Sequence, residues 1–401
     1  MRILLLSTSM GMGGADKQIL TAAQQLRSEG HELMIVSLTE LGPMGHQARS
    51  LGIPTESLDM PRGIADPRGL FRLIRLVRRW KPDLVHSHMV HANLMARLLR
   101  LLAPVPALVQ TIHSVFEGGP HLAAAYRLTS GLADHMTVVS QAAADRVIRE
   151  RIFPESLVRV VPNGVDVELF KGVPPGRRES LRRELGLHGE FVWLAVGRFE
   201  TPKDYPTMLR GFARVREQHP ASILLLVGRG SLQAETEALA RELGLGDNVR
   251  FVGVRDDIPE IMSAVDGYVM SSAWEGMPMV LLEAAAAALP IVATNVGGNG
   301  QLVQDQENGY LVAPNSAEDL AGAMLRLMRL AESERRAMGV RGRELVRSRY
   351  GLNRTVEQWE EVYRDVLSRK GLDARPAGSS RRIAEPLSRG VKSGEASGGQ
   401  R

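Results

Sequence analysis

The chain has 401 residues, of which 44% are hydrophobic and 24% are charged, so it is long enough for two globular domains. It contains no cysteine, which excludes disulfides, thiolate metal sites and cysteine nucleophiles. No apolar run approaches the roughly 18 residues that span a bilayer, so a cytoplasmic protein is expected. The net charge of +5 favours anionic partners, but aromatic residues make up only 4% of the chain, which argues against a base-stacking surface for nucleic acid.

Residues 1–168 are expected to form a first domain of alternating strands and helices. Mostly apolar runs predict strands at residues 2–7, 32–38, 83–88, 107–113 and 135–140. Continuous apolar strands that alternate with helices are typical of a parallel sheet covered on both faces. The first domain is therefore predicted to be an α/β fold with a doubly wound parallel sheet.

A glycine turn follows the first strand, with Gly11, Gly13 and Gly14 just ahead of a predicted helix. The third glycine of a dinucleotide fingerprint would fall on Asp16, so the turn does not favour nicotinamide binding. A short Gly-Gly turn still lets backbone N–H groups approach a phosphate or a sugar. A plain tight turn remains the alternative.

A strongly basic segment spans residues 67–81 and contains no acidic residue. Its apolar positions have helical spacing, so it is either a core-packed helix with a solvated basic face or a helix that contacts anionic lipid headgroups or pyrophosphates. A second segment of this kind, L-M-A-R-L-L-R-L-L at 94–102, slightly favours the lipid contact. The apolar stripe consists of Leu70, Leu73, Ile74 and Val77, and the basic residues are Arg68, Arg72, Arg75, Arg78, Arg79 and Lys81.

Histidines gather near two strand ends of the first domain. His86, His88 and His91 could in principle hold a metal ion, but no carboxylate or cysteine lies near them in sequence, so a metal site is disfavoured. His113 ends a predicted strand at the carboxyl edge of the sheet, where open parallel sheets bind ligands. Its alternative is a structural histidine with satisfied hydrogen bonds.

A turn at Asn163-Gly164 precedes the expected domain boundary near Glu168, and residues 169–350 are expected to form a second domain. Arg198 and Lys203 come just after its first strand, where cations would meet a diphosphate, although each alone would be an ordinary surface charge. The predicted strands lie within 191–200, 222–231, 248–254, 266–272, 290–294 and 309–312.

The most informative stretch is S-A-W-E-G-M-P-M-V-L-L-E-A-A-A-A-A-L-P at 272–290. Pro278 stands where a first helical residue is expected, so Glu275 and Glu283 bracket a helix N-terminus. The N–H groups of that end suit a phosphate, and carboxylates beside it suit sugar hydroxyls. The pattern indicates a sugar-nucleotide site; the alternative is two solvated glutamates flanking a buried alanine-rich helix.

Together these motifs resemble those of the retaining glycosyltransferases of family 4, which have the GT-B fold, two Rossmann-like domains facing across a cleft. The resemblance runs in family order along most of the chain and is more specific than any single motif. The matching pieces are the Gly-Gly-Ala turn, V-P-N-G-V-D at 161–166, V-G-R-F at 196–199 with Lys203, E-G-M-P-M-V-L-L-E at 275–283, and A-T-N-V-G-G-N at 293–299.

The resemblance implies a role for each matching residue. Glu283 would hold the ribose hydroxyls of the nucleotide, and Glu275 the hydroxyls of the transferred sugar. Arg198 and Lys203 would neutralise the diphosphate as the sugar leaves, and His113 would orient the sugar or stabilise positive charge at its anomeric carbon. Further donor-binding positions would be Gly13, Gly14, Arg255 in the loop at 253–257, Gly276, Met277, Pro278, Met279 and Val280.

The implied reaction moves a sugar from a nucleoside-diphosphate sugar, with UDP expected, to a hydroxyl of a cell-surface glycan precursor such as a lipid-linked one. No cofactor and no metal ion are expected. The expected partners are the donor, the glycan acceptor and the anionic inner face of the plasma membrane, but not nucleic acid. The alternatives are an epimerase or phosphorylase on the same two-domain plan, or a non-catalytic membrane-surface protein.

Two positions depart from the family pattern. Ala288 stands where glycine is common, and Gln301 stands where an acidic residue is common. The family pattern therefore does not predict which polar contacts form near Gln301. Residues 351–370 predict an amphipathic helix that in the family crosses back to the first domain. Residues 371–401 are rich in Gly, Ser and Arg and are expected to be disordered. The apolar stripe of the helix consists of Val356, Trp359, Val362, Tyr363 and Val366.

Overall fold

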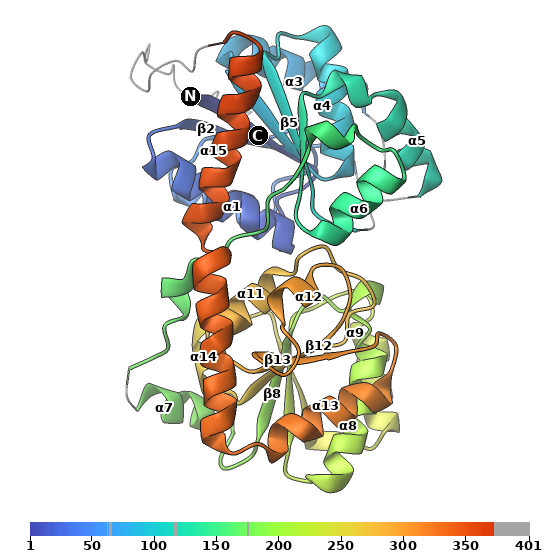
Figure 1. Ribbon diagram of the computed structural model, residues 1–401, viewed down its shortest axis with the longest axis vertical. Coiled ribbons are helices and arrows are strands. Elements are labelled where there is room, and N and C mark those ends of the chain that lie inside the picture. The colour runs from blue at the N-terminus through green and yellow to red at the C-terminus, as the bar shows by residue number, and fades with distance from the viewer. Residues whose placement is uncertain (62, 64–65, 116–118, 175, 373–401) are drawn as a thin grey trace, which may run out of the picture.

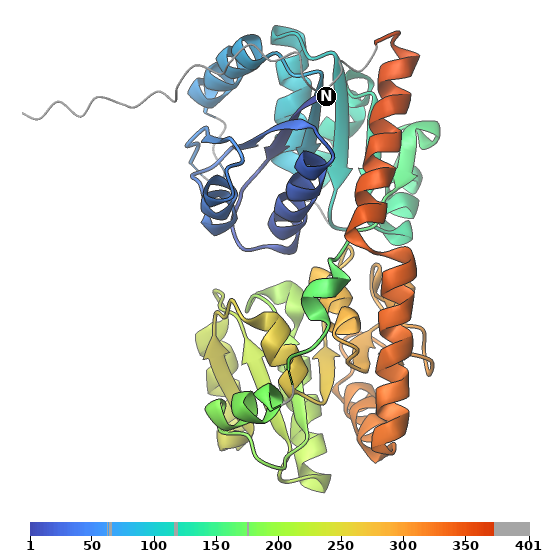
Figure 2. The same ribbon diagram turned by 90° about the vertical axis from the view of Figure 1, so that its left-hand side faces the viewer.

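A computed structural model describes residues 1–61, 63, 66–115, 119–174 and 176–372, which form two lobes (Figure 1). Each lobe is a parallel sheet flanked by helices, as the sequence predicts. The last two helices, α14 (Glu332–Arg349) and α15 (Leu352–Arg369), run along one side of both lobes (Figure 2). The predicted tail beyond residue 372 lies outside the described residues.

Within the described residues, the first domain has a seven-stranded sheet in the order β3-β2-β1-β4-β5-β6-β7, and all its pairings are parallel. Strands β3 and β7 were not predicted, because each is three residues long, lies at a sheet edge and lacks a continuous apolar run. The elements are β1 (Arg2–Ser7), α1 (Gly14–Ser28), β2 (Glu32–Ser37), α2 (Pro43–Ser50), β3 (Thr55–Ser57), α3 (Pro67–Trp80), β4 (Leu84–His88), α4 (Val90–Leu102), β5 (Ala107–Ile112), α5 (Pro120–Leu128), η1 (Ser130–Leu132), β6 (His135–Val138), α6 (Gln141–Arg149), η2 (Glu155–Leu157) and β7 (Val158–Val160).

The second domain has a six-stranded sheet in the order β10-β9-β8-β11-β12-β13, again with parallel pairings throughout the part that the structure describes. Every predicted strand of this domain is present. Its elements are η3 (Val167–Phe170), α7 (Arg177–Glu184), β8 (Val192–Val196), η4 (Thr201–Lys203), α8 (Tyr205–Gln218), β9 (Ile223–Val227), α9 (Gln233–Glu242), η5 (Gly246–Asn248), β10 (Val249–Gly253), α10 (Ile258–Ala264), β11 (Gly267–Met270), α11 (Met279–Ala286), β12 (Ile291–Thr294), α12 (Asn299–Leu302), β13 (Gly309–Val312) and α13 (Ala317–Arg329).

The chain crosses between the domains twice, and the two crossings lie side by side. The N–H of Val165 donates to the carbonyl of Tyr350 at 3.0 Å, and the N–H of Leu352 donates to the carbonyl of Val165 at 3.0 Å. Gly164 allows this approach, because a Cβ there would lie 2.5 Å from Thr355 Oγ1. The first crossing therefore lies a few residues before Glu168, where the sequence places the boundary.

Helix α15 packs back onto the first domain. The predicted stripe is confirmed, because its five residues are all buried, with Trp359 and Tyr363 at most 2% exposed. They join residues of β1, β4, β5 and α1 in one apolar cluster. Burial of large side chains contributes about 1.5–3 kcal/mol each, so α15 is an integral part of the first domain.

Beneath α15 lie two buried histidines, His86 and His88. His86 uses both ring nitrogens, with Nδ1 2.7 Å from the hydroxyl of Tyr363 and Nε2 2.7 Å from that of Thr111. His88 pairs with His113, whereas His91 is exposed. Among the described residues, His86, His88 and His91 do not form a group of possible metal ligands, and both ring nitrogens of His86 have other partners. Burial lowers the pKa of His86, of His88 and of His113, the last to about 4.

The basic segment forms α3, which packs through Leu73 and Val77 and leaves its arginines exposed. Phe71 on the same helix is 60% exposed, with the guanidinium of Arg75 5.1 Å from its ring centre. The core-facing stripe is confirmed at Leu73, Ile74 and Val77, which pack in the core of the first domain, and a basic face that also carries an aromatic ring points outward. No helix in the described part of the chain combines the length and apolar character of a membrane span.

We expect the free energy of unfolding to fall as the pH drops below about 6.5. A neutral buried histidine stabilises the fold fully above its unfolded pKa of about 6.5, and this contribution is lost as the pH falls toward the lower folded pKa, by up to about 1.4 kcal/mol per pH unit for each ring. Denaturant unfolding between pH 7.5 and 4.5 should therefore show a shallower slope for His113→Asn than for the unmodified chain. His46→Asn, at an exposed position, should keep the original slope.

Candidate functional site

The carboxyl ends of strands from both sheets supply the residues that meet between the two lobes. The glycine turn follows β1, His113 follows β5, Arg198 and Lys203 follow β8, and Glu275 follows β11. Helices α1 and α11 face each other across this junction (Figure 1). In parallel sheets these strand ends are where ligands bind, so the junction is the candidate site.

The loop before α11 touches the first domain directly. A Cβ on Gly276 would lie 2.0 Å from the carbonyl oxygen of His113, so only glycine fits this backbone approach. A Cβ on Gly14 would lie 3.3 Å from Met279, at the first residue of α11. The structure therefore brings His113, the glycine turn and the start of α11 together. Pro278 is the cap of α11 rather than its first residue.

Lys203 and Glu275 form one polar cluster at this helix start. The ammonium of Lys203 lies 2.6 Å from Glu275 Oε1, and the hydroxyl of Ser272 donates to the same oxygen at 2.8 Å. The two charged side chains are 20% and 13% exposed, so the pair is largely shielded from water. The loops after β8 and β11 are joined further, because Ser271 donates to the carbonyl of Lys203 at 2.8 Å.

Glu283 meets a cation from the other domain. Lys17 on α1 lies 2.6 Å from Glu283 Oε1; the lysine side chain is 43% exposed, whereas the glutamate is 2% exposed. Burial raises the pKa of Glu283, and the ion pair with Lys17 lowers it again in part. The ionised form of Glu283 is therefore stabilised by a cation from the first domain.

The glycine turn already has an internal partner. The N–H of Gly13 donates to Asp16 at 3.0 Å, and burial raises the pKa of this carboxyl group. Arg198 is exposed and is close enough to lower the pKa of Asp16 by Coulombic attraction. A phosphate at the turn would therefore take the place of the Asp16 carboxylate beside Gly13, with Arg198 nearby.

Two further side chains connect the linker and the first domain to the second domain. The amide of Asn163 donates to the carbonyl of Met277 at 2.8 Å. Gln301 accepts the N–H of Gln141 at 3.2 Å, which makes it a contact between domains. An amide oxygen thus serves as the acceptor at the position where the family commonly has an acidic residue.

Arg255 is not part of this constellation within the described residues. It forms an exposed ion pair with Asp257, at 2.6 Å, in the loop after β10. Val280 is half-buried on α11, and Met277 and Met279 are buried in the core of the second domain, so they offer only backbone groups.

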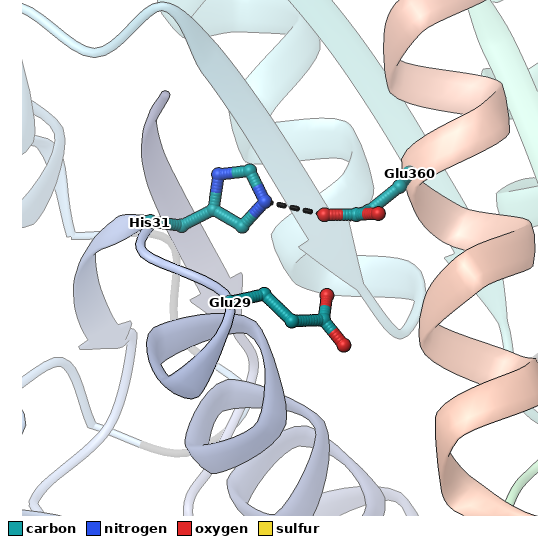
Figure 3. Close-up of side chains that lie close together, drawn as sticks. All are labelled: Glu29, His31 and Glu360. Atoms are coloured by element: carbon teal, nitrogen blue, oxygen red, sulfur yellow. Dashed lines mark hydrogen bonds and ion pairs between the residues drawn. The ribbon is translucent and has the colours of Figure 1, made fainter. Parts of the chain in front are cut away.

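A separate group of possible metal ligands lies elsewhere, made of Glu29, His31 and Glu360 (Figure 3). Their ligand atoms lie within 4.8 Å of one another. Both ring nitrogens of His31 have partners, with Nε2 2.5 Å from Glu360 and Nδ1 3.3 Å from the amino group of Met1. Glu29 ends α1 at the opposite end from Gly14, about 22 Å along a 15-residue helix. The group anchors α15 and is not part of the candidate site.

Sequence reasoning missed Lys17, Asp16 and the pairing of His88 with His113. Lys17 and Asp16 lie in the first turn of the helix that follows the glycines, so they lie on the same side of the domain as the glycine turn. The partner of Lys17, Glu283, lies 266 residues away in the sequence, and the cation near Asp16 is Arg198 of the facing domain. These partners are therefore identified by the arrangement of the two lobes. The assembled site offers two carboxylate–lysine pairs, one exposed arginine and a helix start. These groups suit a ligand that has both hydroxyls and a diphosphate.

Two family models match the chain in consecutive halves. Residues 12–169 match the model described as glycosyltransferase family 4, and residues 177–345 match the model described as glycosyl transferases group 1. The matches meet at the interdomain linker, so each covers one lobe.

Several characterised proteins are similar over most of their length. A protein of Escherichia coli, a UDP-Gal:alpha-D-GlcNAc-diphosphoundecaprenol alpha-1,3-galactosyltransferase, is 26% identical over 90% of this chain and 95% of its own. A D-inositol 3-phosphate glycosyltransferase of Corynebacterium aurimucosum is 29% identical over 89% of this chain and 92% of its own. The crystal structure of Anabaena Alr3699/HepE with UDP-glucose superposes with a TM-score of 0.81 at 23% identity, covering 91% of this chain and 100% of that one, and shows the same fold.

We expect Lys17→Met to destabilise the protein through Glu283. The buried carboxylate loses its cation, and because Lys17 is partly exposed the cost should be about 1–3 kcal/mol, below that of a fully buried pair. Adding Glu283→Gln should recover most of this loss, because the amide needs no counter-charge. Denaturant unfolding at pH 7.5 tests both, with Lys171→Met as an exposed control. A double variant as unstable as the single one would contradict the interpretation.

Proposed function

We propose that this chain, which belongs to the family 4, group 1 glycosyltransferases with the GT-B fold, transfers a sugar with retention of configuration from a nucleoside-diphosphate sugar to a glycan hydroxyl. The observation that carries the proposal is that Lys203–Glu275 and Lys17–Glu283 flank the start of one helix, α11, at the interdomain junction. One site therefore offers acceptors for hydroxyls beside cations for phosphates.

Glu283 is the proposed ribose site. An ionised carboxylate has only acceptor groups, so it suits the two hydroxyl donors of a ribose. Lys17 is 43% exposed and can move aside, while Glu283 stays fixed in the core of the second domain. Nucleotide binding then replaces an ion pair between the domains with hydrogen bonds to the ligand.

The proposed chemistry depends on charge at the diphosphate. As the bond from the anomeric carbon to the phosphate oxygen breaks, negative charge grows on the leaving diphosphate. Arg198, Lys203 and the N-terminus of α11 are placed to stabilise that charge, which lowers the barrier without a metal ion. Lys203 would leave Glu275 to meet the phosphate, which releases Glu275 for the hydroxyls of the sugar.

The positively charged sugar then reacts with the acceptor hydroxyl. His113 is neutral at pH 7 because burial lowers its pKa to about 4, so its role is to hold the sugar rather than to donate a proton. Its contact with Gly276 keeps it next to the donor-side loop. Retention of configuration rests on membership of the family.

A UDP sugar and a lipid-linked acceptor are the proposed substrates. The similar E. coli protein takes UDP-galactose and a diphosphoundecaprenol acceptor, and the structurally similar Anabaena protein binds UDP-glucose. An acceptor of this kind lies in a membrane, and the first domain presents a surface to match. We call this the basic-apolar surface; it consists of Phe71, Arg75, Arg78 and Arg79 of α3 with Leu98, Leu101 and Leu102 of α4.

The basic-apolar surface has the composition of a peripheral membrane contact. Phe71, Leu101 and Leu102 are 60%, 63% and 44% exposed, and Arg78 donates to the carbonyl of Leu102 at 3.0 Å, so the two helices present them together. Exposed apolar side chains among arginines suit anionic headgroups above an acyl layer. We therefore include peripheral binding to the cytoplasmic face of a membrane in the proposal.

We expect the donor-site variants to separate binding from chemistry. Glu283→Ala should weaken UDP binding about tenfold to a hundredfold, because charged hydrogen bonds are lost, whereas Arg198→Ala should mainly lower kcat, by about 10²- to 10³-fold. Lys203→Ala should resemble Arg198→Ala. The measurements are calorimetric UDP binding and steady-state transfer with a panel of nucleotide sugars and a lipid-diphosphate acceptor.

Arg210→Ala, at an exposed position on α8, is the control for these variants. Full activity in Arg198→Ala or Lys203→Ala would remove the diphosphate role. Conversion of the donor without an acceptor would favour an epimerase, and release of a sugar phosphate from a glycan would favour a phosphorylase. No binding of UDP, GDP or ADP would overturn the proposed enzyme as a whole.

We expect Arg75→Gln with Arg79→Gln to reduce binding to anionic vesicles about tenfold or more, since each arginine near the membrane surface contributes about 1 kcal/mol. Phe71→Ser should weaken binding further and independently of salt. Sedimentation with phosphatidylglycerol vesicles measures both. Arg210→Gln with Arg214→Gln removes the same charge from α8 and should have no effect; equal loss in that control would show that only net charge matters.

A further inference from the structure

Helices α1 and α11 meet at their N-terminal ends. Gly14 is the first residue of α1, and Met279 is the first residue of α11. A Cβ added to Gly14 would lie 3.3 Å from the side chain of Met279 and 4.0 Å from its backbone nitrogen. The first turn of a helix carries partial positive charge and N–H groups without partners inside the helix. Two such ends at one place favour a group with several negative charges.

Lys17 and Glu283 bridge the same two helices about one turn further along each. Lys17 is three residues after Gly14 and Glu283 is four residues after Met279, so they lie about 4.5 Å and about 6 Å along the helix axes from the two starts. The ammonium of Lys17 lies 2.6 Å from Glu283 Oε1, while 43% of the lysine side chain is exposed. Because this side chain is long and flexible, the ammonium can reach back to the helix starts without any movement of α1.

Two lysines of the junction are paired with glutamates in the same way. Lys17 faces Glu283 and Lys203 faces Glu275, both at 2.6 Å. A lysine paired in this way is not free to meet a phosphate until its glutamate gains another partner, because the shielded carboxylate would otherwise be left without a cation. A nucleotide sugar meets both needs at once, since its hydroxyls donate to the glutamates and its phosphates attract the lysines.

We infer that Lys17 is a further cation of the diphosphate site: when ribose hydroxyls bind Glu283, the ammonium of Lys17 moves to the diphosphate at the starts of α1 and α11. The inference rests on the proposed function, which supplies the nucleotide sugar. Lys17 then acts from the first domain on the same leaving group that Arg198 and Lys203 meet from the second. Transfer therefore requires the two domains to stay together while the bond to the diphosphate breaks.

The alternative is that Lys17 serves only as the counter-charge of Glu283. Uridine and UDP share the ribose, so both compete with Lys17 for Glu283, and only UDP carries the diphosphate. The ratio of the Kd for uridine to the Kd for UDP therefore measures the diphosphate contacts, because effects at Glu283 cancel. Loss of a counter-charge leaves this ratio unchanged, whereas loss of a phosphate contact lowers it.

The test measures both dissociation constants for the full-length protein, UDP by calorimetry and uridine, which lacks the phosphates, by ligand-observed NMR. Lys17→Met should lower the ratio about tenfold or more, because a charged hydrogen bond to phosphate is lost. Lys17→Arg keeps the charge, so its ratio should fall less. Lys171→Met, at an exposed position, should keep the ratio of the unmodified protein. If GDP or ADP binds in place of UDP, the ratio is taken with the matching nucleoside.

A second pair of variants covers the case in which Lys17→Met does not fold. Glu283→Gln removes the charge that Lys17 neutralises, so adding Lys17→Met to it leaves no buried carboxylate at this position without a cation. From Glu283→Gln to the double variant the ratio should again fall about tenfold or more, because the phosphate contact of Lys17 is lost in the same way.

Transfer kinetics provide a second readout. Lys17→Met should lower kcat about tenfold or more, because negative charge on the diphosphate grows as the bond to the sugar breaks. Lys171→Met should keep the unmodified kcat. A Lys17→Met variant that folds and transfers the sugar at the unmodified rate would contradict the role of Lys17 at the leaving group.

A ratio that stays unchanged in Lys17→Met, or between Glu283→Gln and the double variant, overturns the inference and leaves the proposed function in place. Failure of the unmodified protein to bind any of the three nucleoside diphosphates overturns the proposed function, and the inference with it. The second result is seen before any variant is made, so the two failures are distinguished.

Discussion

Glu283 carries a carboxylate in a position where only 2% of its side chain reaches solvent, and the arrangement of the two lobes depends on how that charge is met. An ionised carboxylate away from water is strongly disfavoured unless a cation or several donors face it. Helix α11 is too rich in alanine and leucine to supply one, so the cation comes from α1 of the first domain. The charge state of Glu283, the proposed ribose site, and the contact between the domains are thereby coupled, so a ligand that bonds to Glu283 would change both.

The two domains are also connected on the side of the molecule where α14 and α15 lie. The chain crosses between the lobes at Val165 and again at Gly351, and the two segments bond to each other, so they form one connection rather than two independent hinges. Beyond it, α15 packs Trp359 and Tyr363 over the histidines that lead to His113. A helix near the end of the chain therefore supports the first-domain half of the candidate site. The second-domain half depends instead on the loops after β8 and β11, joined by Lys203 and Glu275.

Much of the fold and part of the site could be predicted because the relevant signals are local. Long buried strands such as β1 and β9 are continuous apolar runs, and the stripe of α15 repeats at helical spacing. The short edge strands β3 and β7 have neither signal, because their pairing with a neighbour, and not their own side chains, makes them strands. Arg198, Lys203, Glu275 and Glu283 follow strands or start a helix, and the family motifs contain them. Lys17 and Asp16 have no such marker, since each acts on a group contributed by the opposite domain.

The sequence by itself determined the two-domain α/β plan, the family and the helix start that two glutamates bracket, since backbone periodicity and glycine and proline positions are properties of neighbouring residues. The tertiary structure decided which charges meet. It paired Glu283 with Lys17 and Glu275 with Lys203, left Arg255 in a pair with Asp257, and placed His88 of β4 within hydrogen-bond distance of His113. The physical reason is that electrostatic and hydrogen-bond energies depend on distance and on exclusion of water, and both arise only when distant segments pack together.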